Sequence, residues 1–180
     1  MFRTEQVEQG TTHILERIRD VFQHNPIREQ GLTVVTNSEG NAVFIPTRKS
    51  MGGPNHVSFK DYQEKHFQYL LGVLHSHPNR TLFSSQDILS LLAGRILFEG
   101  IVNPSKYYIT FRTKDSKNLS LSYSVNKRYL LAMAKEYGVS FSPHPLDDSP
   151  VFRMTEDMFS ELNMPLYVGN RRRLRLKRIR

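Results

Sequence analysis

The most informative pattern of hydrophobic and polar positions lies near the middle of the chain. A short apolar run over residues 69–74 is followed directly by His75-Ser76-His77-Pro78. A run of this length predicts a buried strand, and Pro78 ends it because proline has no backbone N–H to donate. Side chains at alternate positions of a strand share one face. His75 and His77 are therefore predicted to lie side by side at the end of this strand.

A second apolar pattern follows after a short loop and has helical spacing. Its members are Ile88, Leu89, Leu91, Leu92, Ile96 and Leu97. Ser84 just before this segment is a signal for a helix N-cap, and Gly100 after it is predicted to end the helix. Asp87 falls in the first turn. A carboxylate at the start of a helix can thus approach two imidazoles at the end of a strand.

The remaining pattern predicts further strands and helices around this centre. An amphipathic helix is expected near residues 5–24, and a helix is expected at each of 127–137 and 154–162. Two hairpins are expected, one from strands 32–36 and 42–45 and one from strands 107–111 and 119–123. Residues 47–66 are predicted to be irregular, and Pro143, Pro145 and Pro150 are predicted to interrupt regular structure.

Composition places limits on the class of protein. A chain of 180 residues with 38% hydrophobic residues can form a domain with a substantial core. No apolar run reaches the length of a membrane span, and the first residues lack the pattern of a signal peptide. The chain has no cysteine, which excludes disulfides and thiolate ligands and fits a cytoplasmic protein.

Two imidazoles and one carboxylate form a ligand set that suits zinc. Three protein ligands leave the fourth tetrahedral position open, as in catalytic zinc sites. Each half of the pattern has an ordinary explanation, since His-x-His at a strand end needs no metal and Ser-x-x-Asp resembles a capping box. The two halves together, joined by a short loop, favour a metal site.

These residues also resemble a known motif. His75-Ser76-His77-Pro78 followed by Ser84-x-x-Asp87 is similar to the JAMM motif of JAB/MPN-type zinc metalloproteases, over about residues 10–125. The resemblance implies an α/β, cytidine-deaminase-like fold with a mixed sheet flanked by helices. It also implies one zinc ion per chain, bound by His75, His77 and Asp87 at a strand end and a helix N-terminus. Ser84 would then stabilise the tetrahedral intermediate. The segment between Pro78 and Ser84 is one residue shorter than is usual in that family.

The resemblance further implies a glutamate upstream that acts as the general base. In the family this residue lies on or just before the first strand after the first helix, and Glu29 occupies that place here. Glu39, in the turn of the first predicted hairpin, and Glu64, in the irregular segment, are the alternatives.

The activity implied by the resemblance is hydrolysis of an amide or isopeptide bond next to a ubiquitin-like modifier, with the modifier or its conjugate as substrate. Two alternatives from other classes remain at this point. One is a JAMM-like binding module without activity, although such modules typically lose the metal ligands. The other is a nucleic-acid-binding protein that uses its basic C-terminus.

The C-terminus carries nearly all of the net charge. The chain has a formal charge of +8, and seven of residues 171–180 are Lys or Arg, so residues 1–170 together carry only +1. We predict a catalytic region over 1–125, an extension packed on the same domain over 126–169 and a basic tail over 170–180. The tail is interpreted as a solvated segment or as a docking arm for an acidic protein or nucleic acid. Leu174 and Leu176 alternate with charges as in a strand.

Overall fold

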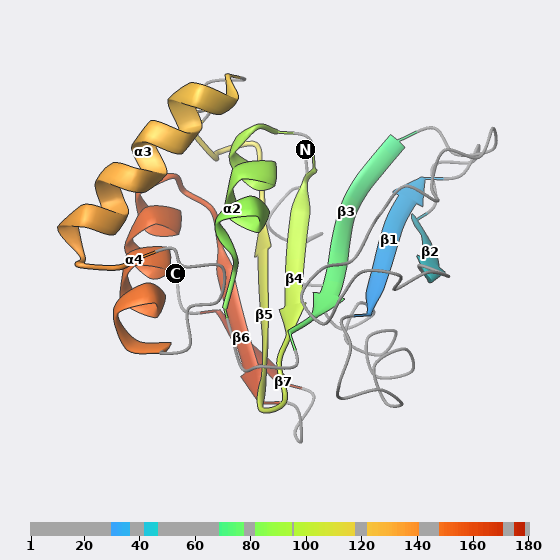
Figure 1. The fold of residues 1–180 in the computed structure, drawn as a ribbon. Coiled ribbons are helices and arrows are strands. Elements are labelled where there is room, and N and C mark those ends of the chain that lie inside the picture. The colour runs from blue at the N-terminus through green and yellow to red at the C-terminus, as the bar shows by residue number, and fades with distance from the viewer. Residues whose placement is uncertain are drawn as a thin grey trace.

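The strands of the protein form one mixed sheet of seven strands in the order β2-β1-β3-β4-β5-β6-β7 (Figure 1). The structure is a computed structural model and describes residues 30–36, 42–46, 69–77, 82–94, 96–117, 122–140, 148–170 and 175–178. The described strands are β1 (Gly31–Thr36), β2 (Ala42–Pro46), β3 (Tyr69–Ser76), β4 (Phe98–Val102), β5 (Lys106–Phe111), β6 (Leu166–Asn170) and β7 (Arg175–Arg178). The described helices are α2 (Ser85–Leu92), α3 (Tyr123–Glu136) and α4 (Asp148–Glu161). The predicted mixed α/β architecture is thus confirmed.

The centre of the sheet is a β-α-β unit formed by β3, α2 and β4. β3 and β4 are parallel, and every other pair of neighbouring strands that the structure describes is antiparallel. Parallel strands cannot be joined by a tight turn, so the chain must return along the sheet through a crossover, here α2. α2, α3 and α4 lie on the same side of the sheet (Figure 1).

An apolar cluster is buried on each face of the sheet. Helical side chains dominate the first cluster, which includes Val73, Ile88, Leu91, Ile101, Leu130, Met154, Phe159 and Leu166. Strand side chains form the second cluster, which includes Leu32, Val34, Leu74, Phe98, Val102, Ile109, Phe111 and Tyr167. Consecutive residues of a strand, such as Val73 and Leu74, fall in different clusters because strand side chains alternate between faces. Within the described residues, no helix is long and apolar enough to cross a membrane.

The prediction that α2 would extend to Gly100 is wrong. α2 ends at Leu92, and Gly94 adopts the left-handed conformation, with φ of 68°. Glycine takes this conformation at no steric cost, so the chain turns there. The apolar residues that follow lead into β4, and Gly100 lies within that strand. An apolar run alone does not distinguish the end of a helix from the start of a buried strand.

The predicted second hairpin is also wrong. β5 is present, but its neighbours are β4 and β6 rather than residues 119–123. Of that predicted strand, Ser122 is the N-cap of α3 and Tyr123 is the first helical residue, while 119–121 lie outside the described residues. Alternation over five residues is a local signal, whereas strand pairing also depends on burial, and most residues of β6 are buried.

The helices predicted at 127–137 and 154–162 are confirmed with changes at their boundaries, since α3 spans Tyr123–Glu136 and α4 spans Asp148–Glu161. α3 buries Leu130 and Ala134, whereas Leu131 is 52% exposed. Pro150 does not interrupt structure, since it lies in the first turn of α4. The first turn tolerates proline because its backbone N–H groups have no partner within the helix. The first hairpin, β1 with β2, is confirmed. The predicted helix at 5–24 and the irregular segment at 47–66 lie outside the described residues.

Part of the basic tail belongs to the sheet. β7 pairs antiparallel with β6, with Gly169 opposite Leu176 and Tyr167 opposite Arg178. Lys177 and Arg178 are exposed on this edge strand. Charged side chains on an edge strand discourage pairing with other chains. Arg175–Arg178 is therefore a structural strand and not a free extension.

Truncation after Asn170 is expected to destabilise the protein, because β6 would lose the backbone hydrogen bonds to β7 at about 0.5–1.5 kcal/mol each. For a chain of this size, each kcal/mol lost lowers the melting temperature by about 2–4 °C, which calorimetry can measure. Replacing Lys177 with Thr keeps the strand but removes one charge, so this control is expected to melt close to the wild type. An unchanged melting temperature in the truncated protein would contradict the structural role of β7.

Candidate metal centre

The two predicted imidazoles lie at the end of β3, a strand that is paired with a neighbouring strand on each side. His75 is opposite Gly31 of β1 and opposite Ile101 of β4. Just beyond the strand, the His77 backbone N–H donates a hydrogen bond of 2.8 Å to the Val102 carbonyl. The backbone carrying both imidazoles is thus fixed before any ligand binds.

Both imidazoles are buried and point to the same place. The side chains of His75 and His77 belong to residues that are 4% and 5% exposed, and their Nε2 atoms are 2.8 Å apart. That separation is a hydrogen bond in which one ring donates to the other. The ring centroids lie 4.7 Å apart at an interplanar angle of 62°. The i and i+2 pattern therefore brings the two nitrogens together, as predicted.

Asp87 completes the predicted ligand set. Its Oδ1 lies 3.5 Å from His75 Nε2, and its Oδ2 lies 3.8 Å from His77 Nε2. All three donor atoms fall within 4.8 Å of one another. Ligands of a tetrahedral zinc ion lie about 3.3 Å apart, given bonds of about 2.0–2.1 Å. Each imidazole thus has one Asp87 oxygen near this distance, Oδ1 for His75 and Oδ2 for His77. The two Nε2 atoms need to separate by about half an ångström.

A capping box at the start of α2 orients the carboxylate. The Ser84 backbone N–H donates to Asp87 Oδ2 at 2.6 Å, and the Asp87 backbone N–H donates to Ser84 Oγ at 3.3 Å. The predicted N-cap is thus confirmed. The capping explanation and the metal explanation of Ser-x-x-Asp are compatible, because the cap itself turns Asp87 toward the imidazoles.

The electrostatic surroundings favour an ionised Asp87. Burial raises the pKa of its carboxyl, but the charge of His75, its hydrogen bonding and the charge of His77 together hold that pKa far below its usual range. The side chain is only 12% exposed. A carboxylate that is ionised and largely buried provides a strong ligand for a divalent cation.

Glu99 is a second acidic residue at this centre that the sequence analysis missed. It lies on β4, is 2% exposed, and its Oε1 is 3.9 Å from His75 Nδ1. Burial and the nearby Asp87 carboxylate raise the pKa of Glu99 well above its usual range. In the sequence, Glu99 is the one acidic residue in the otherwise uncharged run 98–102. Its significance becomes visible only when that run is assigned to a strand.

Gln30, the residue that follows the predicted general base Glu29 in the sequence, is hydrogen-bonded to β3. Ser76 Oγ accepts a hydrogen bond from the Gln30 N–H at 2.8 Å, and the Ser76 N–H donates to the Gln30 carbonyl at 2.8 Å. Glu29 precedes Gln30 in the sequence but itself lies outside the described residues, as do Glu39 and Glu64.

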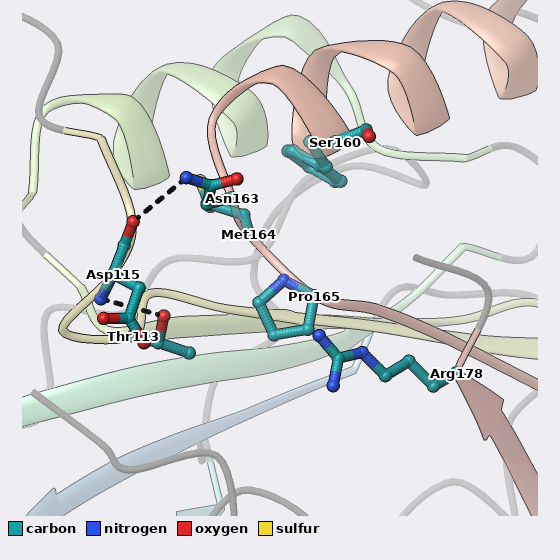
Figure 2. Close-up of a pocket in the computed structure, with 8 residues that line it drawn as sticks. Thr113, Asp115, Ser160, Asn163, Met164, Pro165 and Arg178 are labelled. Atoms are coloured by element: carbon teal, nitrogen blue, oxygen red, sulfur yellow. Dashed lines mark hydrogen bonds between the residues drawn. The ribbon is translucent and has the colours of Figure 1, made fainter.

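A cavity of about 540 Å³ lies at the other end of the sheet. Figure 2 shows its lining, which comes from the segment after β5, the end of α4 and β7: Thr113, Asp115, Phe159, Ser160, Asn163, Met164, Pro165 and Arg178. β5 ends at Phe111, which is opposite Phe98 at the start of β4, whereas the metal ligands lie where β3 and β4 end. This cavity is therefore separate from the metal centre.

Comparison with known proteins gives no assignment. No family model matches the chain, and no curated protein or solved structure matches it. The case for a metal centre accordingly rests on the geometry of these three side chains. They are the one group of three or more metal-ligating residues found in the part of the chain that the structure describes.

Purified protein is expected to bind about one zinc ion per chain, and the His75→Ala, His77→Ala double variant is expected to lose it, because two of three ligands are gone. Zinc affinity should fall as the pH is lowered, since imidazole must be deprotonated to bind. Calorimetric titration with zinc measures both effects. Asp115→Asn, which removes a carboxylate far from the centre, serves as the control. Full zinc occupancy in the double variant would rule out this ligand set.

Proposed function

We propose that the protein is a zinc-dependent hydrolase of the JAMM type, which cleaves an amide or isopeptide bond next to a ubiquitin-like modifier. The observation that carries the proposal is the convergence of His75, His77 and Asp87 at a strand end and a helix start. Their order and spacing in the sequence resemble the JAMM motif, and their arrangement fits a single zinc ion.

The ligand set supports catalysis rather than a structural metal. Three protein ligands leave one coordination position for water or substrate. Zinc bound there would act as a Lewis acid, polarising the scissile carbonyl and lowering the pKa of water to about 7. The remaining tasks, moving a proton and stabilising the developing oxyanion, fall to side chains of this chain.

We propose Glu29 as the general base, which takes a proton from the attacking water and delivers it to the leaving amine. Strand pairing supports this role. Gly31 lies opposite His75, and partners in an antiparallel pair step in opposite directions. Gln30, which follows Glu29 in the sequence, is hydrogen-bonded to Ser76, the residue between the two imidazoles.

Ser84 is suited to donate a hydrogen bond to the oxyanion. In the capping box its hydroxyl oxygen acts as an acceptor toward the Asp87 N–H. A hydroxyl has one O–H donor in addition to its two acceptor lone pairs, so this donor is not used by the cap. Ser84 also adjoins the carboxylate ligand through its own backbone N–H. Ser84 therefore lies within one helical turn of the proposed metal ligand Asp87.

The basic C-terminus supports a further contact with an acidic protein or nucleic acid. Lys177 and Arg178 are exposed on β7, and clustered cations raise the rate of association with an acidic surface. A comparison of binding at low and high salt, using the Lys177→Thr variant, measures this contribution.

Glu29→Gln is expected to fold, to retain zinc and to lose turnover by a factor of about 10²–10⁴, because glutamine cannot accept the proton. Turnover is measured by release of a fluorophore joined through an amide bond to the C-terminus of ubiquitin-like proteins. Glu39→Gln is the matched control and is expected to remain active. Near-normal turnover in Glu29→Gln, together with loss in the Glu39 or Glu64 variant, would move the base to another carboxylate.

Variants of Ser84 separate its two roles. Glycine at an N-cap costs only a few tenths of a kcal/mol relative to serine, and it keeps the backbone N–H that binds Asp87. Ser84→Gly is therefore expected to stay nearly as stable as the wild type while turnover falls by about 10²–10³, the usual effect of losing an oxyanion donor. Ser84→Thr keeps both the cap and the O–H, and is expected to retain activity. Equal turnover in the Gly and Thr variants would exclude the oxyanion role.

A further inference from the structure

Glu99 is an acidic residue in the protein interior, where an ionised side chain is unfavourable. It is 2% exposed, and every other residue of β4 is also buried. A carboxyl group removed from water destabilises a protein unless it is neutralised, paired or hydrogen-bonded. Its Oε2 is buried and makes no hydrogen bond in the structure. A buried polar group of this kind calls for a functional or structural explanation.

The register of the sheet directs Glu99 toward the metal centre. Glu99 is opposite Val73 in the parallel pair of β3 and β4, and Ile101 is opposite His75. Paired residues and residues two apart share a face, so the side chains of Glu99 and His75 lie on the same side of the sheet. This is the side covered by the helices, where Val73 and Ile101 are buried.

The two nitrogens of His75 have different neighbours. Nε2 faces the ligand group, at 2.8 Å from His77 Nε2 and 3.5 Å from Asp87 Oδ1. Nδ1 faces Glu99 Oε1 at 3.9 Å. This distance is too long for a hydrogen bond but is within reach of a small rotation of the glutamate side chain. Glu99 is not among the residues whose donor atoms converge on the ion position. Its carboxyl group also lies close enough to the Asp87 side chain to interact with it.

We propose that Glu99 is a positioning residue that accepts a hydrogen bond from His75 Nδ1–H and thereby presents His75 Nε2 to the metal. An imidazole that binds a metal through one nitrogen usually donates its other N–H to a carboxylate or carbonyl, which fixes the tautomer and the ring orientation. This inference rests on the proposed metal centre but not on the substrate of the proposed hydrolase.

Zinc affinity of Glu99 variants tests the proposal. Loss of such a partner typically weakens metal binding by about 10–100-fold. Competition with a chromophoric chelator is expected to give this loss for Glu99→Leu and a smaller loss for Glu99→Gln, whose amide oxygen can still accept. Phe98→Leu is the matched control, because Phe98 is the preceding residue of β4 and belongs to the cluster on the opposite face. This control is expected to keep wild-type zinc affinity.

Two further measurements separate positioning from a purely structural role. Imidazole ¹⁵N resonances of the zinc-loaded wild type should show a proton on Nδ1 of His75, and this signal should be altered in Glu99→Gln. The metal-free Glu99→Leu protein should melt at or above the wild-type temperature, since it no longer buries a carboxyl group. A structural role instead predicts a lower melting temperature with zinc affinity unchanged.

Wild-type zinc affinity in a folded Glu99→Leu protein would overturn the proposal. If that variant fails to fold, Glu99→Gln decides, and unchanged affinity with an unchanged His75 signal would overturn it. Either result would leave the hydrolase proposal intact. Conversely, a wild-type protein that binds zinc but does not cleave amide-linked ubiquitin-like substrates would overturn the hydrolase proposal while Glu99 keeps its positioning role.

Discussion

The hydrogen bond from the Ser84 backbone N–H to the Asp87 carboxylate joins helix capping to the candidate chemistry of this protein. At 2.6 Å it fixes the carboxylate at the first turn of α2, on the side that faces His75 and His77. A helix N-terminus attracts negative charge, so a carboxylate at this position stabilises the helix even without a metal. The same residue can therefore support the fold and act as a ligand, and the centre needs little rearrangement to bind an ion.

The parallel pairing of β3 and β4 places this helix start where it is needed. The crossover must begin at the end of β3 and return to the start of β4, so α2 begins beside the end of the strand that carries the two imidazoles. Open α/β sheets commonly bind ligands outside the carboxyl ends of their strands. Glu99 then reaches the back of His75 because β4 lies directly beside β3 in the sheet.

The three candidate ligands were predictable because each depends on local rules. Strand alternation places His75 beside His77, and the capping pattern places Asp87 in the first turn of a helix.

Glu99 was not predictable in the same way. Its role depends on β4, and in the sequence Ile96 and Leu97 continue the helical spacing of α2, although the chain turns at Gly94 before them. The sheet partner of β5 was missed for a related reason, because β6 comes from a distant part of the sequence. Alternation in the tail did indicate a strand, but charge favoured a solvated segment.

We propose that His75, His77 and Asp87 hold one zinc ion with an open coordination position. X-ray absorption at the zinc edge of the stoichiometric complex measures the number and type of ligands directly. We expect four nitrogen or oxygen ligands at about 2.0–2.1 Å, with the multiple scattering of two imidazoles. We also expect one imidazole contribution to disappear in His77→Ala. Six-coordinate zinc without imidazole scattering, or a spectrum that His77→Ala leaves unchanged, would exclude this ligand set.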